Sequence, residues 1–242
     1  SLAVGAAVAW AGSQGGARIG TVPVFATGVL LAYAVNWVAF VPAYLCRTER
    51  FYDLTGSVTY LSVVLTALAV PPAPHPRSLL LGGLVTVWAL RLGTYLFARV
   101  RQAGRDRRFD ELKHSFWRFL MTWSLQALWV VLTVGCALAA MTSHRRPSLD
   151  LAAAAGTAVW VAGFLIEAAA DGQKRRFRAD PANAGRFIRS GLWSWSRHPN
   201  YFGEILLWTG IALIALPALS GWQHVTLVSP VFVYVLLTRV SG

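Results

Sequence analysis

Polar side chains stand at the start of an apolar run in the stretch GLWSWSRHPNYFGEILLWTG, residues 191–210. Pro199 favours the first turn of a helix, because its missing N–H has no intrahelical partner there. Asn200 and Glu204 then lie on one helix face by their i, i+4 spacing. The free N–H groups and positive dipole end of such a helix, next to Arg197, predict an anion-binding site with a carboxylate one turn deeper. An ordinary capped helix with interfacial aromatic residues is the alternative.

A second acidic pair precedes this stretch, in FLIEAAADGQKRRFRAD. Glu167 and Asp171 share a helix face, and ionisable residues within membrane spans normally face a polar interior. We expect Asp171 and Asn200 to hold sugar or amide groups of a ligand. Arg178 and Arg186 are expected to hold phosphates, because the planar guanidinium group can donate two hydrogen bonds to one phosphate. Pairing of Asp171 with the basic residues that directly follow it is the alternative.

Carboxyl and hydroxyl groups also enter an apolar run in RTERFYDLTGSVTYLSVV. Asp53, Ser57 and Tyr60 follow i, i+4, i+7 spacing, and Tyr52 precedes them. They place a carboxyl group, a hydroxyl group and phenols near the membrane interface, where they are candidate proton donors. A helix cap with an aromatic belt is the alternative.

A fourth group begins at Arg91, about two turns inside the apolar part of WALRLGTYLFARVRQAGRDRRFD, and Tyr95 follows on the same helix face. Snorkelling of the Arg91 side chain to the interface is the alternative. The five histidines are scattered, and Cys46 and Cys136 lie in or beside different apolar runs. The sequence therefore predicts no metal site, and both cysteines are expected to be buried thiols.

These groups must be positioned by helices in a membrane. The chain has 242 residues, of which 56% are hydrophobic and 13% are charged, about half the charged fraction usual in soluble domains. The sequence predicts an all-α, polytopic integral membrane bundle of about seven transmembrane helices, in a single domain over residues 1–242. The apolar runs near the ~20 residues that span a bilayer are 22–45, 54–70, 78–98, 117–141, 150–170, 202–220 and 223–240. A shorter run at 2–12 is either an eighth span or an interfacial segment.

The net charge of +12 is placed unevenly along the chain. Of the 22 lysines and arginines, 17 lie on one side of the predicted bundle, mainly in 99–118 and 171–200, and 4 lie on the other. The positive-inside rule makes the basic side cytoplasmic, and this orientation signal explains most of the asymmetry. The density of cations in two facing loops still exceeds what orientation requires. It indicates an anionic ligand on that side rather than a nucleic acid.

The stretch GLWSWSRHPNYFGEILLW, together with the preceding EAAADGQKRRFRAD, resembles the C-terminal region of the steroid 5-alpha-reductase family, in its broad bacterial branch of membrane proteins. The resemblance is firm over about 160–210 and looser over 47–130. It implies a multi-span reductase of the bacterial inner membrane that binds NADPH from the cytoplasmic side and reduces a conjugated C=C bond. The expected partners are membrane lipids and a lipophilic substrate, a steroid-like or other lipid enone.

Carried over by position, the resemblance implies a cofactor site built from cytoplasmic helix ends and the loops 99–118 and 171–200. Its residues would be Arg91, Glu167, Asp171, Arg178, Arg186 and Asn200, and Arg197 and Glu204 of the anion-binding stretch join them. For catalysis, Asp53 and Tyr52 stand where the family has Glu and Gln, and Trp88 stands in the place of its tyrosine. Tyr60 and Tyr95 are the other candidate proton donors.

Two other functions fit parts of the sequence. The Arg-His-Pro-x-Tyr element, residues 197–201, also resembles isoprenylcysteine carboxyl methyltransferases, which bind S-adenosylmethionine in a similar bundle. S-adenosylmethionine carries no phosphate, so the arginine series favours a dinucleotide. A non-enzymatic lipid-binding membrane protein is the third possibility.

Overall fold

The structure, a computed structural model, describes residues 1–70, 74–103 and 109–240, without the side chains of 99–103 and 240. The described part is almost entirely helical, apart from one hairpin of two-residue strands, β1 (Arg18–Ile19) and β2 (Val22–Pro23). The α-helices are α1 (Leu2–Gly12), α2 (Val24–Leu45), α3 (Tyr52–Ala69), α4 (Pro76–Ala103), α5 (Phe116–Thr142), α6 (Leu151–Ala179), α7 (Pro199–Ala215) and α8 (Val228–Val235). Short 3₁₀ segments and one π-helical turn, Leu236–Val240, complete the chain.

The predicted polytopic helical membrane bundle is confirmed, but the count of about seven spans is not. Six segments of the described chain are long and apolar enough to cross a membrane. They are Val24–Leu45, Pro76–Ala98, Phe116–Thr142, Leu151–Ala179, Pro199–Ala218 and Gly221–Arg239. The predicted span 54–70 is present as α3, which is a helix of 18 residues rich in Thr and Ser, and it is not among the six.

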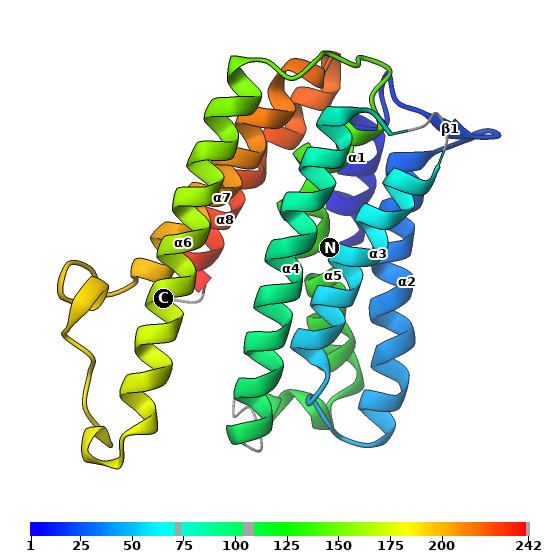
Figure 1. Cartoon of the computed structure of the whole chain (residues 1–242). Coiled ribbons are helices and arrows are strands. Elements are labelled where there is room, and N and C mark those ends of the chain that lie inside the picture. The colour runs from blue at the N-terminus through cyan, green and yellow to red at the C-terminus, as the bar shows by residue number, and fades with distance from the viewer. Residues whose placement is uncertain (71–73, 104–108, 241–242) are drawn as a thin grey trace.

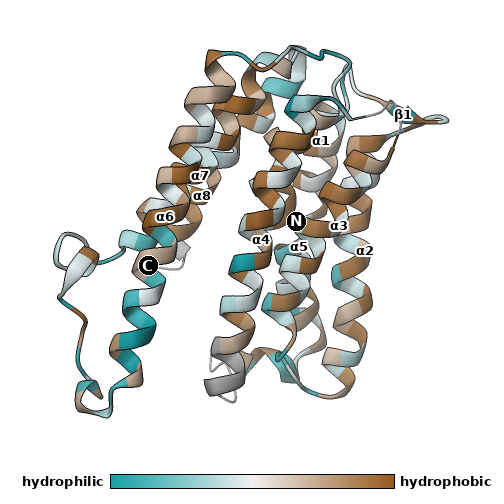
Figure 2. Ribbon diagram, in the orientation of Figure 1, coloured by the Kyte–Doolittle hydropathy of each residue, from teal (hydrophilic) through white to brown (hydrophobic). Residues whose placement is uncertain are grey.

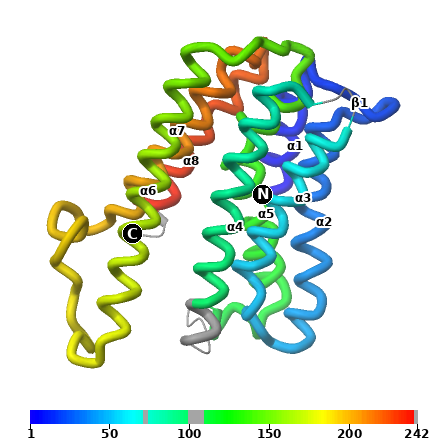
Figure 3. Tube along the Cα trace, viewed as in Figure 1, coloured from blue at the N-terminus to red at the C-terminus, as the bar shows by residue number. Residues whose placement is uncertain are grey.

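Helix α5 lies at the centre of the bundle and is the most buried of the six spans. Helices α1 to α4 pack around it on one side, while α6, α7 and α8 run together on the other (Figures 1 and 3). Hydrophobic residues cover the helices, and hydrophilic residues gather toward the C-terminal half of α6 (Figure 2). The α2–α3 turn and the C-terminal ends of α4 and α6 lie at one end of the bundle (Figure 1). The two basic segments therefore emerge at the same end, although residues 104–108 of the first lie outside the described residues.

The contact between α6 and α7 is the most extensive between any two helices in the described chain, and glycines face each other across it. A Cβ atom at Gly163 would lie 2.5 Å from the Leu207 nitrogen and 2.6 Å from the Gly203 oxygen. Small residues of this kind allow two backbones to touch. The contact fixes the start of α7, with Asn200, against the C-terminal half of α6.

The two cysteines differ in exposure. Cys136 is buried in the core of α5, as predicted, but Cys46 is exposed. The prediction for Cys46 was wrong because this residue is the C-cap of α2, just beyond the part of the helix that packs in the bundle.

Candidate functional site

A polar centre lies between α4, α6 and α7. The Arg91 guanidinium forms an ion pair with Glu167, with 2.6 Å between Nη1 and Oε1, and a second ion pair with Asp171. Asn200 at the start of α7 donates a hydrogen bond from Nδ2 to Asp171 Oδ1 at 3.3 Å. Glu204, one turn further along α7, interacts electrostatically with the same group. The structure thus brings together five of the sequence-predicted cofactor residues.

The polar centre contains buried polar atoms without hydrogen-bond partners, and the donor Trp88 Nε1, near Glu167, is one of them. The side chains of Glu167 and Asp171 are buried, and Arg91 forms an ion pair with each of them. Two buried oxygens, Glu167 Oε2 and Asn200 Oδ1, have no hydrogen-bond partner in the described part of the chain. Buried acceptors without partners are rare because they lose their hydration without compensation. A ligand with N–H or O–H donors would satisfy them.

The surroundings of Arg91 are defined by two acidic partners. The family resemblance implies a position near the cofactor phosphates, and in the structure two carboxylates hold its guanidinium group. Asp171 pairs with Arg91, 80 positions away along the chain, and also interacts electrostatically with Lys174, which follows it closely. Snorkelling does not describe Arg91, because its head group points to partners inside the bundle.

A basic cavity of about 550 Å³, which we call the loop cavity, lies between the end of α6 and the connection to α7. Within the part of the chain that the structure describes, no acidic side chain lines it. The cavity contains the two predicted phosphate-binding arginines and the arginine predicted beside the start of α7, together with a lysine, a further arginine and an aromatic wall. These are Arg178, Arg186, Arg197, Lys174, Arg189 and Trp193.

Several contacts fasten the connection between α6 and α7 to α6. The Trp193 indole donates to the Ala170 carbonyl at 3.0 Å, and the Leu192 N–H donates to Gln173 Oε1 at 3.0 Å. The Lys174 ammonium lies 4.7 Å from the centre of the Trp193 ring. The anchoring role of Gln173 was missed in the sequence, where a lone glutamine among basic residues gave no signal. Trp193 was predicted only as part of an interfacial belt.

The candidate proton donors lie in three different surroundings. The Tyr52 hydroxyl donates to the Thr122 carbonyl at 3.2 Å within a buried aromatic cluster, and Asp53 is half-buried in the first turn of α3. Tyr60 packs edge-on against Trp88, with 5.1 Å between ring centres, and interacts electrostatically with Glu204. These contacts connect Tyr60 to the polar centre.

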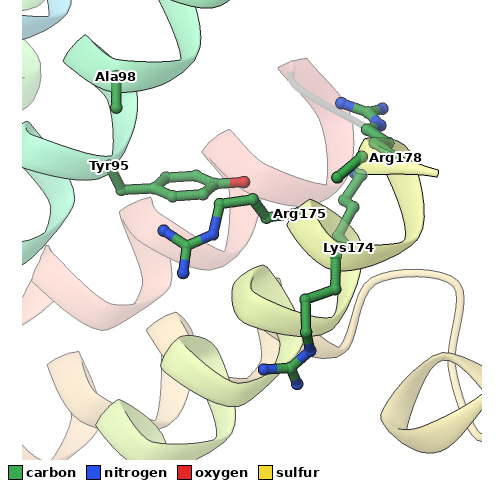
Figure 4. A pocket seen from close by; sticks show the side chains of 7 residues that line it. Tyr95, Ala98, Lys174, Arg175 and Arg178 are labelled. Carbon is green, nitrogen blue, oxygen red and sulfur yellow. The ribbon is translucent and has the colours of Figure 1, made fainter.

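Tyr95 lines a second cavity of about 410 Å³ between α4 and α6, which we call the α4–α6 cavity. Figure 4 shows its side chain pointing from α4 toward the basic residues of α6. Lys174 and Arg178 border this cavity as well as the loop cavity, so the last turns of α6 separate the two.

Comparison with known proteins gives one family and one relative. A stretch of 67 residues is 34% identical to 3-oxo-5-alpha-steroid 4-dehydrogenase 1 of Bos taurus, covering 28% of this chain and 26% of that protein. The match thus spans about a quarter of the length of the relative. No solved structure matches the chain. The model of a family described as "Protein of unknown function (DUF1295)" matches residues 39–242, so the chain belongs to the DUF1295 family.

Proposed function

We propose that this protein is a membrane-embedded, NADPH-dependent reductase of a conjugated C=C bond in a lipophilic enone. The observation that carries the proposal is the loop cavity, in which five basic side chains, and no acidic one among the described residues, surround one space. The printed name of the Bos taurus relative, a steroid dehydrogenase, supports an oxidoreductase.

The side chains fit a phosphorylated dinucleotide. Arg178, Arg186 and Arg197 would hold the phosphates of NADPH through charge-assisted hydrogen bonds, which are about twice as strong as neutral ones. Asn200 and Glu167, with their unpaired buried oxygens, would accept hydrogen bonds from its sugar or amide groups. S-adenosylmethionine has a cationic sulfonium and no phosphate, so this basic cavity favours NADPH over the cofactor of a methyltransferase.

NADPH, when bound, supplies the hydride that such a reduction requires. The protein must then stabilise the negative charge that develops on the carbonyl oxygen of the enone, often the largest catalytic contribution of an enzyme. Asp53 stands in the position of the catalytic glutamate of the resembled family, and Tyr60 lies nearer the polar centre. Either side chain would donate a proton or a hydrogen bond to that oxygen, and the aromatic rings of Trp88 and Trp208 would exclude water around Tyr60.

We further propose that the basic end of the bundle faces the cytoplasm of a bacterial cell and that residues 1–242 form a single transmembrane domain. The cofactor would then enter from the cytoplasm, and the substrate from the bilayer. This arrangement separates a water-soluble ligand from a lipid-soluble one without a large water-filled cavity in the membrane.

The proposal is tested by assaying purified protein with NADPH and a panel of lipophilic enones, including steroid and polyprenoid ketones. We expect oxidation of NADPH that depends on one class of enone, with the saturated ketone recovered as product. A parallel assay supplies S-adenosylmethionine and prenylcysteine. Methyl transfer there, with no NADPH oxidation across the panel, would replace the reductase by the methyltransferase.

A further inference from the structure

We propose that the α4–α6 cavity binds the phosphate head group of an anionic membrane lipid, at a site separate from the loop cavity. Tyr95 and Ala98 of α4 form one wall, and the basic end of α6 forms the other. Lys174, Arg175, Arg176 and Arg178 line the cavity, and no acidic side chain among the described residues does. Figure 4 shows Lys174, Arg175 and Arg178 opposite Tyr95. Four cations around one space indicate an anionic ligand, because their mutual repulsion is relieved by a bound negative charge.

The three arginines of this set are accessible from outside the protein. Arg175, Arg176 and Arg178 are exposed, and no ion pair of these three residues is found within the described part of the chain. The small side chains of Ala98 and Ala179 leave room at the mouth of the cavity. Arginine suits a phosphate head group because its planar fork can donate two hydrogen bonds to one phosphate.

The surroundings of the cavity fit a ligand that carries acyl chains. On α4, the exposed residues Val87 and Leu90 continue by helical spacing to Ala98, which lines the cavity. On α6, exposed Leu165 lies on the same helical stripe as Arg176. The α6 stripe therefore runs from the apolar part of the helix to a cationic end, and the α4 stripe runs to the wall of the same cavity. A phospholipid would lay its acyl chains along the apolar stripes and its phosphate in the cavity. The cavity lies at the basic end of the bundle, and anionic lipids attract lysine and arginine at the membrane surface.

The two cavities can be tested independently because most of their residues differ. Tyr95, Arg175 and Arg176 line only the α4–α6 cavity, whereas Arg186 and Arg197 line only the loop cavity. Substitutions in the first set should affect the lipid, and substitutions in the second should affect the dinucleotide. The inference does not depend on the proposed reductase activity.

The test uses the full chain in a neutral detergent, with thermal stability and native mass spectrometry as readouts. Short-chain phosphatidylglycerol, the matching phosphatidylcholine and inorganic phosphate are titrated separately. We expect saturable binding of phosphatidylglycerol alone, weakened about tenfold or more in the double variant Arg175→Ala/Arg176→Ala, because at least one charge-assisted hydrogen bond is lost. The charge-preserving variant Arg175→Lys/Arg176→Lys should keep most of the binding of phosphatidylglycerol. It is the control for whether the fold tolerates substitution at these two positions. Arg186→Ala should bind the lipid as the wild type does.

Three results would overturn the inference. Equal binding of phosphatidylcholine would mean that no anionic site exists. Equal stabilisation by inorganic phosphate would make the ligand a free anion rather than a lipid. Loss of lipid binding in Arg186→Ala, or displacement of the lipid by NADPH, would make the α4–α6 cavity part of a dinucleotide site.

Discussion

Asp53 and Tyr60 are the two side chains between which the proton-donor role has to be decided. Asp53→Asn keeps the shape of the side chain and a hydrogen-bond donor but removes the acid. We expect NADPH affinity to survive this change and turnover to fall by about 10²-fold or more, the scale of general acid catalysis. Tyr60→Phe, measured in the same assay, is the comparison. Wild-type turnover in Asp53→Asn together with a dead Tyr60→Phe would assign the role to the phenol.

Asp150 gives the protein a predictable response to acid. This residue caps α6 and lies outside the membrane spans. Its carboxylate accepts a hydrogen bond from the Ala153 N–H and lies beside the Arg77 guanidinium group. Both contacts lower the pKa of the carboxyl group below the ordinary value of 3.8. A lowered folded-state pKa stabilises the protein above the unfolded-state value, and this stabilisation is lost as the pH falls through the folded-state pKa.

The measurement is the melting temperature of the wild type and of Asp150→Asn between pH ~6 and ~3. Asparagine keeps the cap and removes the charge. The advantage of the wild type should therefore shrink toward the acid end. A difference that stays constant over this range would show that the Asp150 charge contributes nothing.

The sequence predicts which residues share a face of one helix, but it does not predict which residues of two different helices contact each other. The i, i+4 spacing of Glu167 and Asp171 correctly placed both on one face, because helical geometry alone decides it. Their partner Arg91 lies on α4, a helix that is remote in sequence, and the tertiary arrangement of the helices decides that contact. The sequence could not choose between phosphate and carboxylate as the counter-ion of Arg91.

The glycine contact between α6 and α7 makes a specific prediction at the scale of elements. Gly163→Ala inserts a methyl group 2.5 Å from the Leu207 nitrogen, so the helices must separate. We expect a loss of about 1–3 kcal/mol in stability, the usual effect of overpacking, and a weaker hold on Asn200 and the cofactor. Gly172→Ala is the matched control on the same helix, because nothing lies within 4 Å of its added methyl group.

Chemical or thermal unfolding in detergent measures the stability of the Gly163→Ala and Gly172→Ala variants. Gly172→Ala should leave stability unchanged or raise it by up to about 1 kcal/mol, because alanine favours a helix more than glycine does. Equal stability of the two variants would mean that the α6–α7 contact is looser than its glycines indicate.

Apolar runs predicted where the helices lie better than where they end. The run 117–141 corresponds closely to α5, but the run 150–170 ends nine residues before α6 does. Apolarity marks the part of a helix within the membrane, whereas α6 continues through its basic residues to Ala179. The run 223–240 contains α8 between a 3₁₀ segment and a π-helical turn, local geometry that hydropathy does not encode.

The orientation of the whole molecule can be tested with its own cysteines. Cys46 is exposed near the basic end, and Cys136 is buried. A membrane-impermeant thiol reagent should therefore leave Cys46 unlabelled in spheroplasts of the expressing bacterium and should label it in inside-out vesicles. Arg18→Cys in a Cys46→Ser background, at the opposite end, should show the reverse pattern. Labelling of Cys46 from outside would invert the proposed topology and place the loop cavity outside the cytoplasm.

The binding of NADPH in the loop cavity is the central claim, and a titration of the purified protein tests it most directly. Thermal stability is followed as NADPH or S-adenosylmethionine is added to the wild type, to Arg186→Ala and to Arg18→Ala, an exposed arginine at the opposite end of the bundle. We predict that NADPH stabilises the wild type saturably and that S-adenosylmethionine does not. The affinity for NADPH should be lower by about tenfold or more in Arg186→Ala, because a charge-assisted contact to a phosphate is lost. The affinity should be unchanged in Arg18→Ala. Stabilisation by S-adenosylmethionine instead, or the same NADPH affinity in all three proteins, would contradict the binding of NADPH in the loop cavity.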